Sequence, residues 1–122
     1  MSILVCDDSS VILDIFDQIL ERRNYEIVKA FDGEMAIELA QSLEDIKLIF
    51  MDLNMPRISG WEATKKIRKF HPHVPIIAMS ATISDEEQKK AKKQGFRAAY
   101  RKPLKIQDIR SILDTYITQD AG

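Results

Sequence analysis

Residues 3–10, Ile-Leu-Val-Cys-Asp-Asp-Ser-Ser, hold the pattern that decides the fold. Four apolar residues in succession are typical of a strand that is covered on both faces of a sheet. The polar residues 7–10 that follow at once are of the types that cap the start of a helix. Apolar residues then recur at the i, i+3, i+4 spacing of a helix that we expect to end near Asn24: Ile12, Ile15, Phe16, Ile19 and Leu20.

The same unit, a short apolar run followed by a helix, recurs along the rest of the chain. Four further strands are predicted at residues 26–30, 48–51, 75–79 and 97–101. The helices that follow them are predicted at residues 35–40, 61–70, 84–94 and 106–117. Five strands that are each followed by a helix imply parallel strands joined by right-handed crossovers. The predicted fold class is therefore α/β, a (βα)5 doubly wound parallel sheet of five strands.

Length and composition exclude several classes of protein. The chain has 122 residues, 45% hydrophobic and 30% charged, which suits one domain with its own core and excludes a disordered tail. No apolar run approaches the roughly 18 residues that span a bilayer, and the first residues do not resemble a secretory leader. Cys6 is the one cysteine, which excludes an internal disulfide and a cysteine-only metal site. We expect a cytoplasmic protein that forms a single domain over residues 1–122.

The charges are distributed unevenly along the chain, although the net charge is only −1. Residues 1–61 hold 12 acids and 5 bases, a net charge of −7, whereas residues 62–122 hold 7 acids and 13 bases, a net charge of +6. Such asymmetry can indicate a nucleic-acid face, or an acidic site in one half that bases of the other half complete. Solvated helix faces that happen to differ in charge explain it equally well.

Residues able to carry chemistry stand where the predicted strands end. They are Asp7 and Asp8 after the first strand, Asp52 after the third, Ser80 after the fourth and Lys102 after the fifth. In an open α/β sheet these ends lie at one edge, where ligands bind. Carboxylates about 4–5 Å apart repel each other by about 3–4 kcal/mol per pair at an effective dielectric constant of about 20, so a cation should offset the repulsion. Because oxygen ligands suit Mg²⁺, the pattern predicts a magnesium site.

Asp52 is the best candidate for a nucleophile among these residues, because it is the lone acid of the middle strand. With a divalent ion neutralising its neighbours, a carboxylate can attack phosphorus and form an aspartyl phosphate. Lys102 suits a contact with a phosphate oxygen. Each acid alone is better interpreted as a helix cap or a solvated loop residue, and it is their joint position at strand ends that favours a site.

Four motifs stand in a specific order along the chain. They are Asp7-Asp8-Ser9, Asp52-Leu53-Asn54-Met55-Pro56 with Gly60, Ile76-Ile77-Ala78-Met79-Ser80-Ala81, and Tyr100-Arg101-Lys102-Pro103. In this order and spacing the chain resembles the receiver domain of two-component response regulators, and in particular the chemotaxis regulators, from Ile3 to about Tyr116. The resemblance implies a flavodoxin-like strand order of 2-1-3-4-5 and a phosphorylation-controlled signalling switch, with no output domain in this chain and no turnover of an external substrate.

The resemblance also assigns expected roles at the acidic site. Asp52 would accept a phosphoryl group from a histidine kinase or a phosphotransfer protein. Asp7, Asp8 and Asp52, together with the backbone carbonyl of Asn54, would hold Mg²⁺ or Mn²⁺. Lys102 takes the place of the lysine that contacts a phosphoryl oxygen.

A second set of residues matches the family's switch. Ser80 takes the place of the hydroxyl residue that turns to the phosphate, and Tyr100 that of the aromatic that moves between exposed and buried positions. Pro103 matches the proline after a cis peptide bond. Asn54 and Thr82 match the positions that tune the lifetime of the phosphate.

Two surfaces are expected to bind protein partners. Family members dock the donor kinase against the first helix and the loop after the fifth strand, where Leu13 and Leu104 would form an apolar patch; core packing of Leu13 is an equal alternative. Helix 84–94 has only Ala91 as an apolar residue, which indicates a weakly anchored output surface. A downstream protein would bind the face of the fourth helix, fifth strand and fifth helix. We expect the lysines of that helix to be solvated, with no direct DNA binding and no membrane partner.

Three other classes of protein fit these residues less well. A binding module that has lost phosphorylation is disfavoured because all five site residues are present. A flavin-binding electron carrier would need small and hydroxyl residues after the first strand, where Asp7 and Asp8 stand. A metal-dependent phosphatase with an aspartyl nucleophile would need an acid two residues after Asp52, where Asn54 stands.

Overall fold

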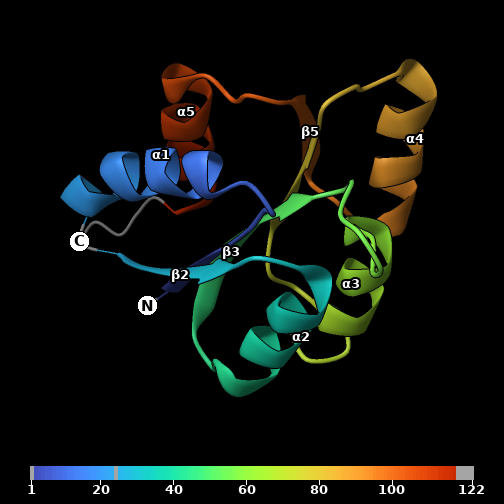
Figure 1. The fold of residues 1–122 in the computed structure, drawn as a ribbon, viewed down its shortest axis with the longest axis horizontal. Helices are drawn as coiled ribbons and strands as arrows, with labels where there is room; N and C mark the ends of the chain where they lie inside the picture. Colours follow the sequence, from blue (N-terminus) through green and yellow to red (C-terminus); the bar gives the residue numbers. More distant parts are fainter. Residues whose placement is uncertain (1, 24, 118–122) are drawn as a thin grey trace.

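The structure, a computed structural model, describes residues 2–23 and 25–117 and shows the predicted alternation of strands and helices (Figure 1). The strands are β1 Ser2–Cys6, β2 Glu26–Ala30, β3 Ile46–Asp52, β4 Ile76–Ser80 and β5 Ala98–Arg101. The helices are α1 Ser10–Leu20, the 3₁₀ turn η1 Glu21–Arg23, α2 Gly33–Ser42, α3 Gly60–Ile67, α4 Asp85–Gln94 and α5 Ile106–Tyr116. The strands pair in parallel in the order β2-β1-β3-β4-β5, which confirms the predicted fold class and strand order.

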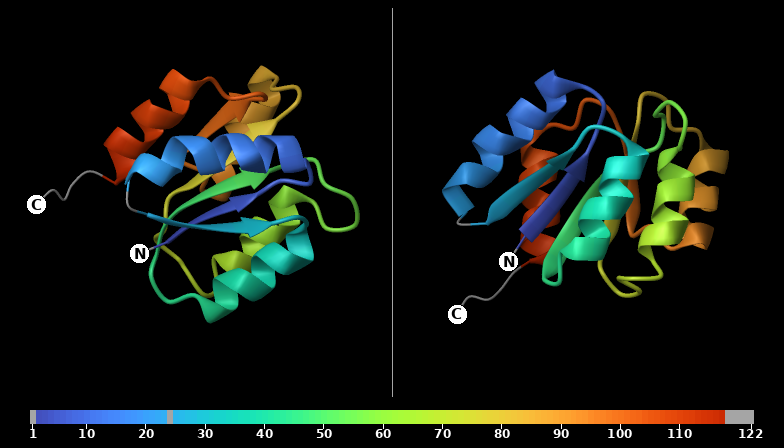
Figure 2. Two further views of the ribbon diagram at one scale, coloured as in Figure 1. Left: turned by 60° about the vertical axis from the view of Figure 1, so that its left-hand side comes forward. Right: turned by 60° about the horizontal axis from the view of Figure 1, so that its bottom comes forward.

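The sheet is the middle layer of three. Helices α1 and α5 pack on one face, whereas α2, α3 and α4 pack on the other (Figure 2). All residues of β1 and β4, and all but Lys47 of β3, are buried because both faces of the sheet are covered. The apolar runs in the sequence therefore mark the three central strands. No helix among residues 2–23 and 25–117 is long and apolar enough to cross a bilayer.

Helix α1 faces the sheet with a different set of residues from the one expected. Leu13, Phe16 and Leu20 are buried, whereas Val11 is 66% exposed and Ile15 is 37% exposed. Leu13 is only 1% exposed and packs in the core on that face of the sheet, so its expected part in a docking patch is wrong. The helix ends at Leu20 and continues as η1. Asn24, where we expected the helix to end, lies outside the described residues.

Helix α3 is shorter than predicted. Ser59 caps its start and forms a capping box with Glu62, and the regular helix ends at Ile67 rather than near residue 70. Residues 69 and 70 follow in tighter turns, with backbone N–H groups bonded three residues back. The Arg68 guanidinium ties this region to the loop before β4 and to the end of α4, because it donates to the carbonyl oxygens of His71, Val74 and Gly95.

Helix α4 begins and ends at strong local signals. Ser84 caps it in a second capping box, with Glu87, and Gly95 ends it in the left-handed conformation at φ 103°. Ala91 is its one buried residue, as the sequence predicts. This helix is therefore well formed but is held to the sheet by little apolar surface.

Candidate functional site

The parallel register brings four predicted site residues to one edge of the sheet. Asp52 is the last residue of β3 and Ser80 the last of β4, while Asp7 and Lys102 directly follow β1 and β5. Because all five strands run in the same direction, these carboxyl ends meet. Gly60 lets α3 start close behind this edge: a Cβ there would lie 2.1 Å from the carbonyl oxygen of Asp52.

Three carboxylates form the centre of the site. Oxygen atoms of Asp7, Asp8 and Asp52 all lie within 4.8 Å of one another. The side chains of Asp7 and Asp52 are 0% exposed, whereas Asp8 is exposed to solvent. Such a set of hard oxygen donors with one open side fits Mg²⁺, which binds a few carboxylates and keeps several of its waters. The donor atoms therefore fit the metal that the sequence predicted.

Lys102 supplies the one positive charge seen inside the cluster of described residues. Its Nζ donates to Asp7 Oδ2 at 3.1 Å and to Asp52 Oδ2 at 3.0 Å, and its side chain is 17% exposed. Partial burial acts to lower the pKa of Lys102, but hydrogen bonds and charge attraction from Asp52 and Asp7 outweigh it and raise the pKa. The ammonium therefore stays charged between the two carboxylates at neutral pH.

Asp52 differs from an ordinary surface carboxylate in basicity. Burial raises its pKa, and the charge of Asp7 raises it further. The backbone N–H of Asn54, which donates to Asp52 Oδ1 at 3.0 Å, and the Lys102 ammonium act in the opposite direction. A more basic carboxylate shares its electrons more readily with an electrophile, which suits a nucleophile.

Ser80 is buried beside Asp52, but its hydroxyl is engaged elsewhere. Its Oγ donates to the carbonyl oxygen of Thr82 at 2.7 Å and accepts from the Thr82 backbone N–H at 3.3 Å. It also accepts from the side-chain amide of Asn54 at 3.0 Å. The bond between Asn54 and Ser80 was not predicted, because the two residues are 26 positions apart and no sequence pattern joins them. Thr82 meets Ser80 through its backbone, and its side chain is exposed.

Tyr100 and Pro103 flank the Arg101-Lys102 pair in the chain. Tyr100 is half-buried on β5 and packs against the cluster that includes α5. Burial raises its pKa, with the charge of Asp108 adding to the effect. The Lys102–Pro103 peptide bond is cis, as the resemblance implies.

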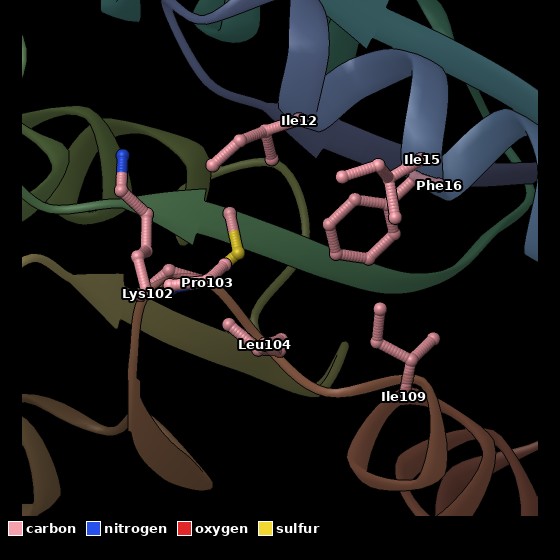
Figure 3. A pocket seen from close by; sticks show the side chains of 8 residues that line it. Ile12, Ile15, Phe16, Lys102, Pro103, Leu104 and Ile109 are labelled. Carbon is pink, nitrogen blue, oxygen red and sulfur yellow. The ribbon is translucent and has the colours of Figure 1, made fainter.

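Leu104 lines a small apolar hollow between α1 and the loop after β5. Figure 3 shows Ile12, Ile15 and Phe16 on one side of it, with Pro103, Leu104 and Ile109 on the other. Ile15 and Ile106 of the neighbouring helices remain exposed, Ile106 at 52%. The apolar surface beside this hollow therefore includes Ile15 and Leu104 and does not include Leu13.

The single cysteine lies directly under the carboxylates. Cys6 ends β1 and is fully buried, with its Sγ 3.5 Å from both the Asp32 carbonyl oxygen and Met55 Sδ. Burial raises the pKa of the thiol, and the charges of Asp52 and Asp7 raise it further. The sulfur therefore stays protonated and takes no part in the chemistry of the site.

Comparisons with known proteins point the same way as this geometry. The sequence model of the response regulator receiver domain matches residues 3–114. The polar-differentiation response regulator DivK of Brucella ovis is 25% identical over 118 residues, covering 95% of each chain. The chemotaxis protein CheY4 of Vibrio cholerae matches with a TM-score of 0.85 and 27% identity, over 95% of this chain and 98% of that one.

A third similar protein has been solved with a metal. It is the receiver domain of a sensor histidine kinase from Pseudomonas aeruginosa, with a magnesium ion coordinated in its active-site cleft. The match has a TM-score of 0.81 and 27% identity, and covers 94% of this chain and 95% of that one.

Proposed function

The chain belongs to the response regulator receiver domain family of two-component signalling, and from this premise we propose that it is a switch that is phosphorylated on Asp52. One observation carries the proposal. Asp52 is a buried carboxylate of raised pKa that has a lysine ammonium at 3.0 Å and two further carboxylates within 4.8 Å. Core packing alone does not account for that concentration of charge, whereas phosphoryl transfer requires it.

The transfer step starts from a phosphohistidine of a histidine kinase or a phosphotransfer protein. A carboxylate oxygen of Asp52 attacks phosphorus and forms an O–P bond as the P–N bond breaks. The electron pair of the P–N bond goes to the imidazole nitrogen, which takes a proton from solvent. Lys102 neutralises charge on a phosphoryl oxygen as the transfer proceeds.

The acidic residues have a second task, which is to hold a divalent cation. We assign Mg²⁺, or Mn²⁺, to Asp7, Asp8 and Asp52 with the backbone carbonyl of Asn54. When bound, the ion offsets the repulsion between the carboxylates and the incoming phosphate. The magnesium ion in the similar Pseudomonas receiver domain supports this assignment.

Phosphate on Asp52 would change the surface through Ser80 and Tyr100. The Ser80 hydroxyl turns to the phosphate, the loop before α4 follows it, and Tyr100 shifts between its half-buried and buried positions. The weakly anchored α4 supports this route, because a helix with one buried residue moves at low cost. The downstream protein would then bind the face made by α4, β5 and α5.

Residues 1–122 act as a single receiver domain in the cytoplasm, and the protein catalyses only its own phosphorylation and dephosphorylation. Asn54 and Thr82 tune the lifetime of the phosphate. The donor docks on the surface of Leu104 and Ile15 beside the site.

The test is labelling with acetyl phosphate and Mg²⁺, followed by intact-mass measurement. We expect the wild type to gain one acid-labile phosphoryl group, a chelator to abolish the gain, and Asp52→Asn to gain none. Asp14→Asn, an exposed acid on α1, is the matched control and should label like the wild type. If the wild type gains no phosphate, or Asp52→Asn gains as much, Asp52 is not the acceptor.

A further inference from the structure

The hydroxyl of Ser80 has no free hydrogen-bonding capacity in this structure. A serine hydroxyl has one hydrogen to donate and two lone pairs to accept. Ser80 gives its hydrogen to the Thr82 carbonyl at 2.7 Å and accepts from the Thr82 N–H at 3.3 Å and the Asn54 amide at 3.0 Å. None of its hydrogen bonds, among the described residues, reaches Asp52. A phosphoryl oxygen can receive the Ser80 hydrogen only after the bond to Thr82 breaks.

Asn54 connects this hydroxyl to the phosphate-accepting residue. Its backbone N–H donates to Asp52 Oδ1 at 3.0 Å, and its side-chain Nδ2 donates to Ser80 Oγ at 3.0 Å. The backbone contact restrains the start of the loop after β3. The Asn54 side chain therefore contacts Ser80 from a backbone that is itself hydrogen-bonded to Asp52. With an amide donor on one side, the Ser80 hydroxyl keeps its own hydrogen pointed at Thr82.

We infer that the Asn54 side chain is a positioning residue that holds the Ser80 hydroxyl on the Thr82 carbonyl, in the off position, until Asp52 is phosphorylated. The inference rests on the proposed function and goes beyond the assignment of Asn54 as a residue that tunes phosphate lifetime. Asn54 acts through the Ser80 hydroxyl and not directly on the phosphate.

We call the hydrogen bonds that hold the Ser80 hydroxyl, from Asn54 and to Thr82, the latch. The burial of these residues explains why the latch can open. Asn54 and Thr82 are both exposed, so water replaces Ser80 as their hydrogen-bond partner when the hydroxyl leaves. Ser80 is fully buried, so its own polar atom must have a protein or phosphate partner in either position. The latch therefore opposes switching by about one net hydrogen bond, which corresponds to about a fivefold shift in an equilibrium.

The test is a double-mutant cycle with beryllofluoride and Mg²⁺, in which beryllofluoride stands in for the phosphoryl group. Wild type, Asn54→Ala, Ser80→Ala and the double variant are titrated, and the bound analogue is measured by fluorine NMR. We expect Asn54→Ala to bind the analogue about fivefold more tightly than the wild type. We expect Asn54→Ala to change nothing in the Ser80→Ala background, because the partner it restrains is then gone.

Two controls separate this role from others. Arg57→Gln changes an exposed residue of the same loop, whose side chain bonds Asp32 and not Ser80, and should leave the affinity unchanged. Urea unfolding without ligand should give Asn54→Ala a folding equilibrium constant about fivefold smaller than that of the wild type, because the bond to Ser80 is lost. With saturating beryllofluoride and Mg²⁺ the two proteins should be equally stable, because that bond is broken in both; a purely structural role would lower the stability in both conditions alike.

The failures of the two proposals are distinguishable. If Asn54→Ala has no effect, or has the same effect with and without the Ser80 hydroxyl, the positioning role is overturned while phosphorylation of Asp52 stands. If the wild type binds no beryllofluoride with Mg²⁺ and gains no phosphate, the proposed function fails, and the inference fails with it.

Discussion

Helices α3 and α4 lie side by side on the same face of the sheet and begin in the same way. Each starts after a serine that forms a capping box with a glutamate three residues on, Ser59 with Glu62 and Ser84 with Glu87. Each carries two lysines in its last turn, which suits the helix dipole. Local chemistry therefore favours helix formation about equally in both segments.

The two helices differ in how many of their residues are buried. In its eight residues α3 buries Gly60, Ala63, Thr64 and Ile67, whereas α4 buries only Ala91 in ten. The contacts between them include polar ones, with Lys90 Nζ 4.4 Å from the Trp61 ring centroid and Gln94 Nε2 donating to the Trp61 carbonyl oxygen. The difference teaches that α4 can shift as an intact helix, because its capping holds it formed while little apolar surface holds it in place.

The largest expected effect comes from a substitution at the start of α3, the helix with more buried residues. Gly60→Ala would place a Cβ 2.1 Å from the Asp52 carbonyl oxygen and 2.8 Å from the Leu53 Cα, so the backbone of α3 or β3 must move. We expect a loss of about 4 kcal/mol in the free energy of unfolding, measured by urea titration.

Gly95→Ala is the matched change in α4. A Cβ there meets only Arg68 Nε at 3.8 Å, and the cost comes from its φ of 103°. We expect a loss of about 1 kcal/mol. Equal losses at the two glycines would contradict the contrast between the helices.

The next effect is a gain in stability from α3. The Thr64 hydroxyl is buried and has no hydrogen-bond partner among the described residues. Thr64→Val keeps the shape and removes the unpaired polar atom, and should raise the free energy of unfolding by about 1.5 kcal/mol. Thr115→Val on α5 is the control: that hydroxyl is exposed and donates to the Ser111 carbonyl oxygen, so no gain is expected.

Removing the helix caps sharpens the comparison. Ser59→Ala and Ser84→Ala each delete one capping hydrogen bond worth about 1 kcal/mol. We expect Ser59→Ala to lower global stability by that amount. Ser84→Ala should instead speed amide hydrogen exchange within α4 and lower global stability less, because α4 can open without the core. If amide hydrogen exchange changed in the same way in the Ser59→Ala and Ser84→Ala variants, α4 would not open separately from the core.

The smallest effect concerns the contact between the helices. Lys90→Gln removes the cation from the Trp61 ring and should cost about 0.5 kcal/mol. Trp61 fluorescence should change with it, and exchange in α4 should rise slightly. Lys89→Gln, an exposed lysine of the same helix, should change neither signal.

Much of the fold could be predicted because the central strands are buried on both faces. The apolar runs at residues 48–51 and 75–79 fall within one or two residues of β3 and β4. The meeting of Asp7, Asp52 and Lys102 followed from the same reasoning, since the ends of parallel strands share an edge. The hydrophobic pattern thus predicted the sheet, and the parallel topology predicted that the charged residues of the site lie together.

The features that the sequence did not predict depend on tertiary packing, which no local sequence pattern contains. The first helix has apolar residues on more than one face, including Val11, Leu13 and Ile15, so periodicity could not choose which face meets the sheet. Just after the end of α3, Arg68 donates to the carbonyls of Val74 and Gly95, and the contact with Gly95 spans 27 residues, which a local pattern does not contain. The bond between Asn54 and Ser80 depends on side-chain positions across two strand ends.

The buried thiol of Cys6 has a practical consequence. Because it stays protonated and buried and is the chain's one cysteine, an alkylating reagent can react at this one position only after the residues that cover the sulfur, Asp32 and Met55 among them, move away. The labelling rate of the folded protein therefore measures how often this part of the molecule opens. A ligand that binds the acidic edge only in the closed, folded state should slow the alkylation of Cys6. The alkylation rate therefore reports how much of the site is occupied.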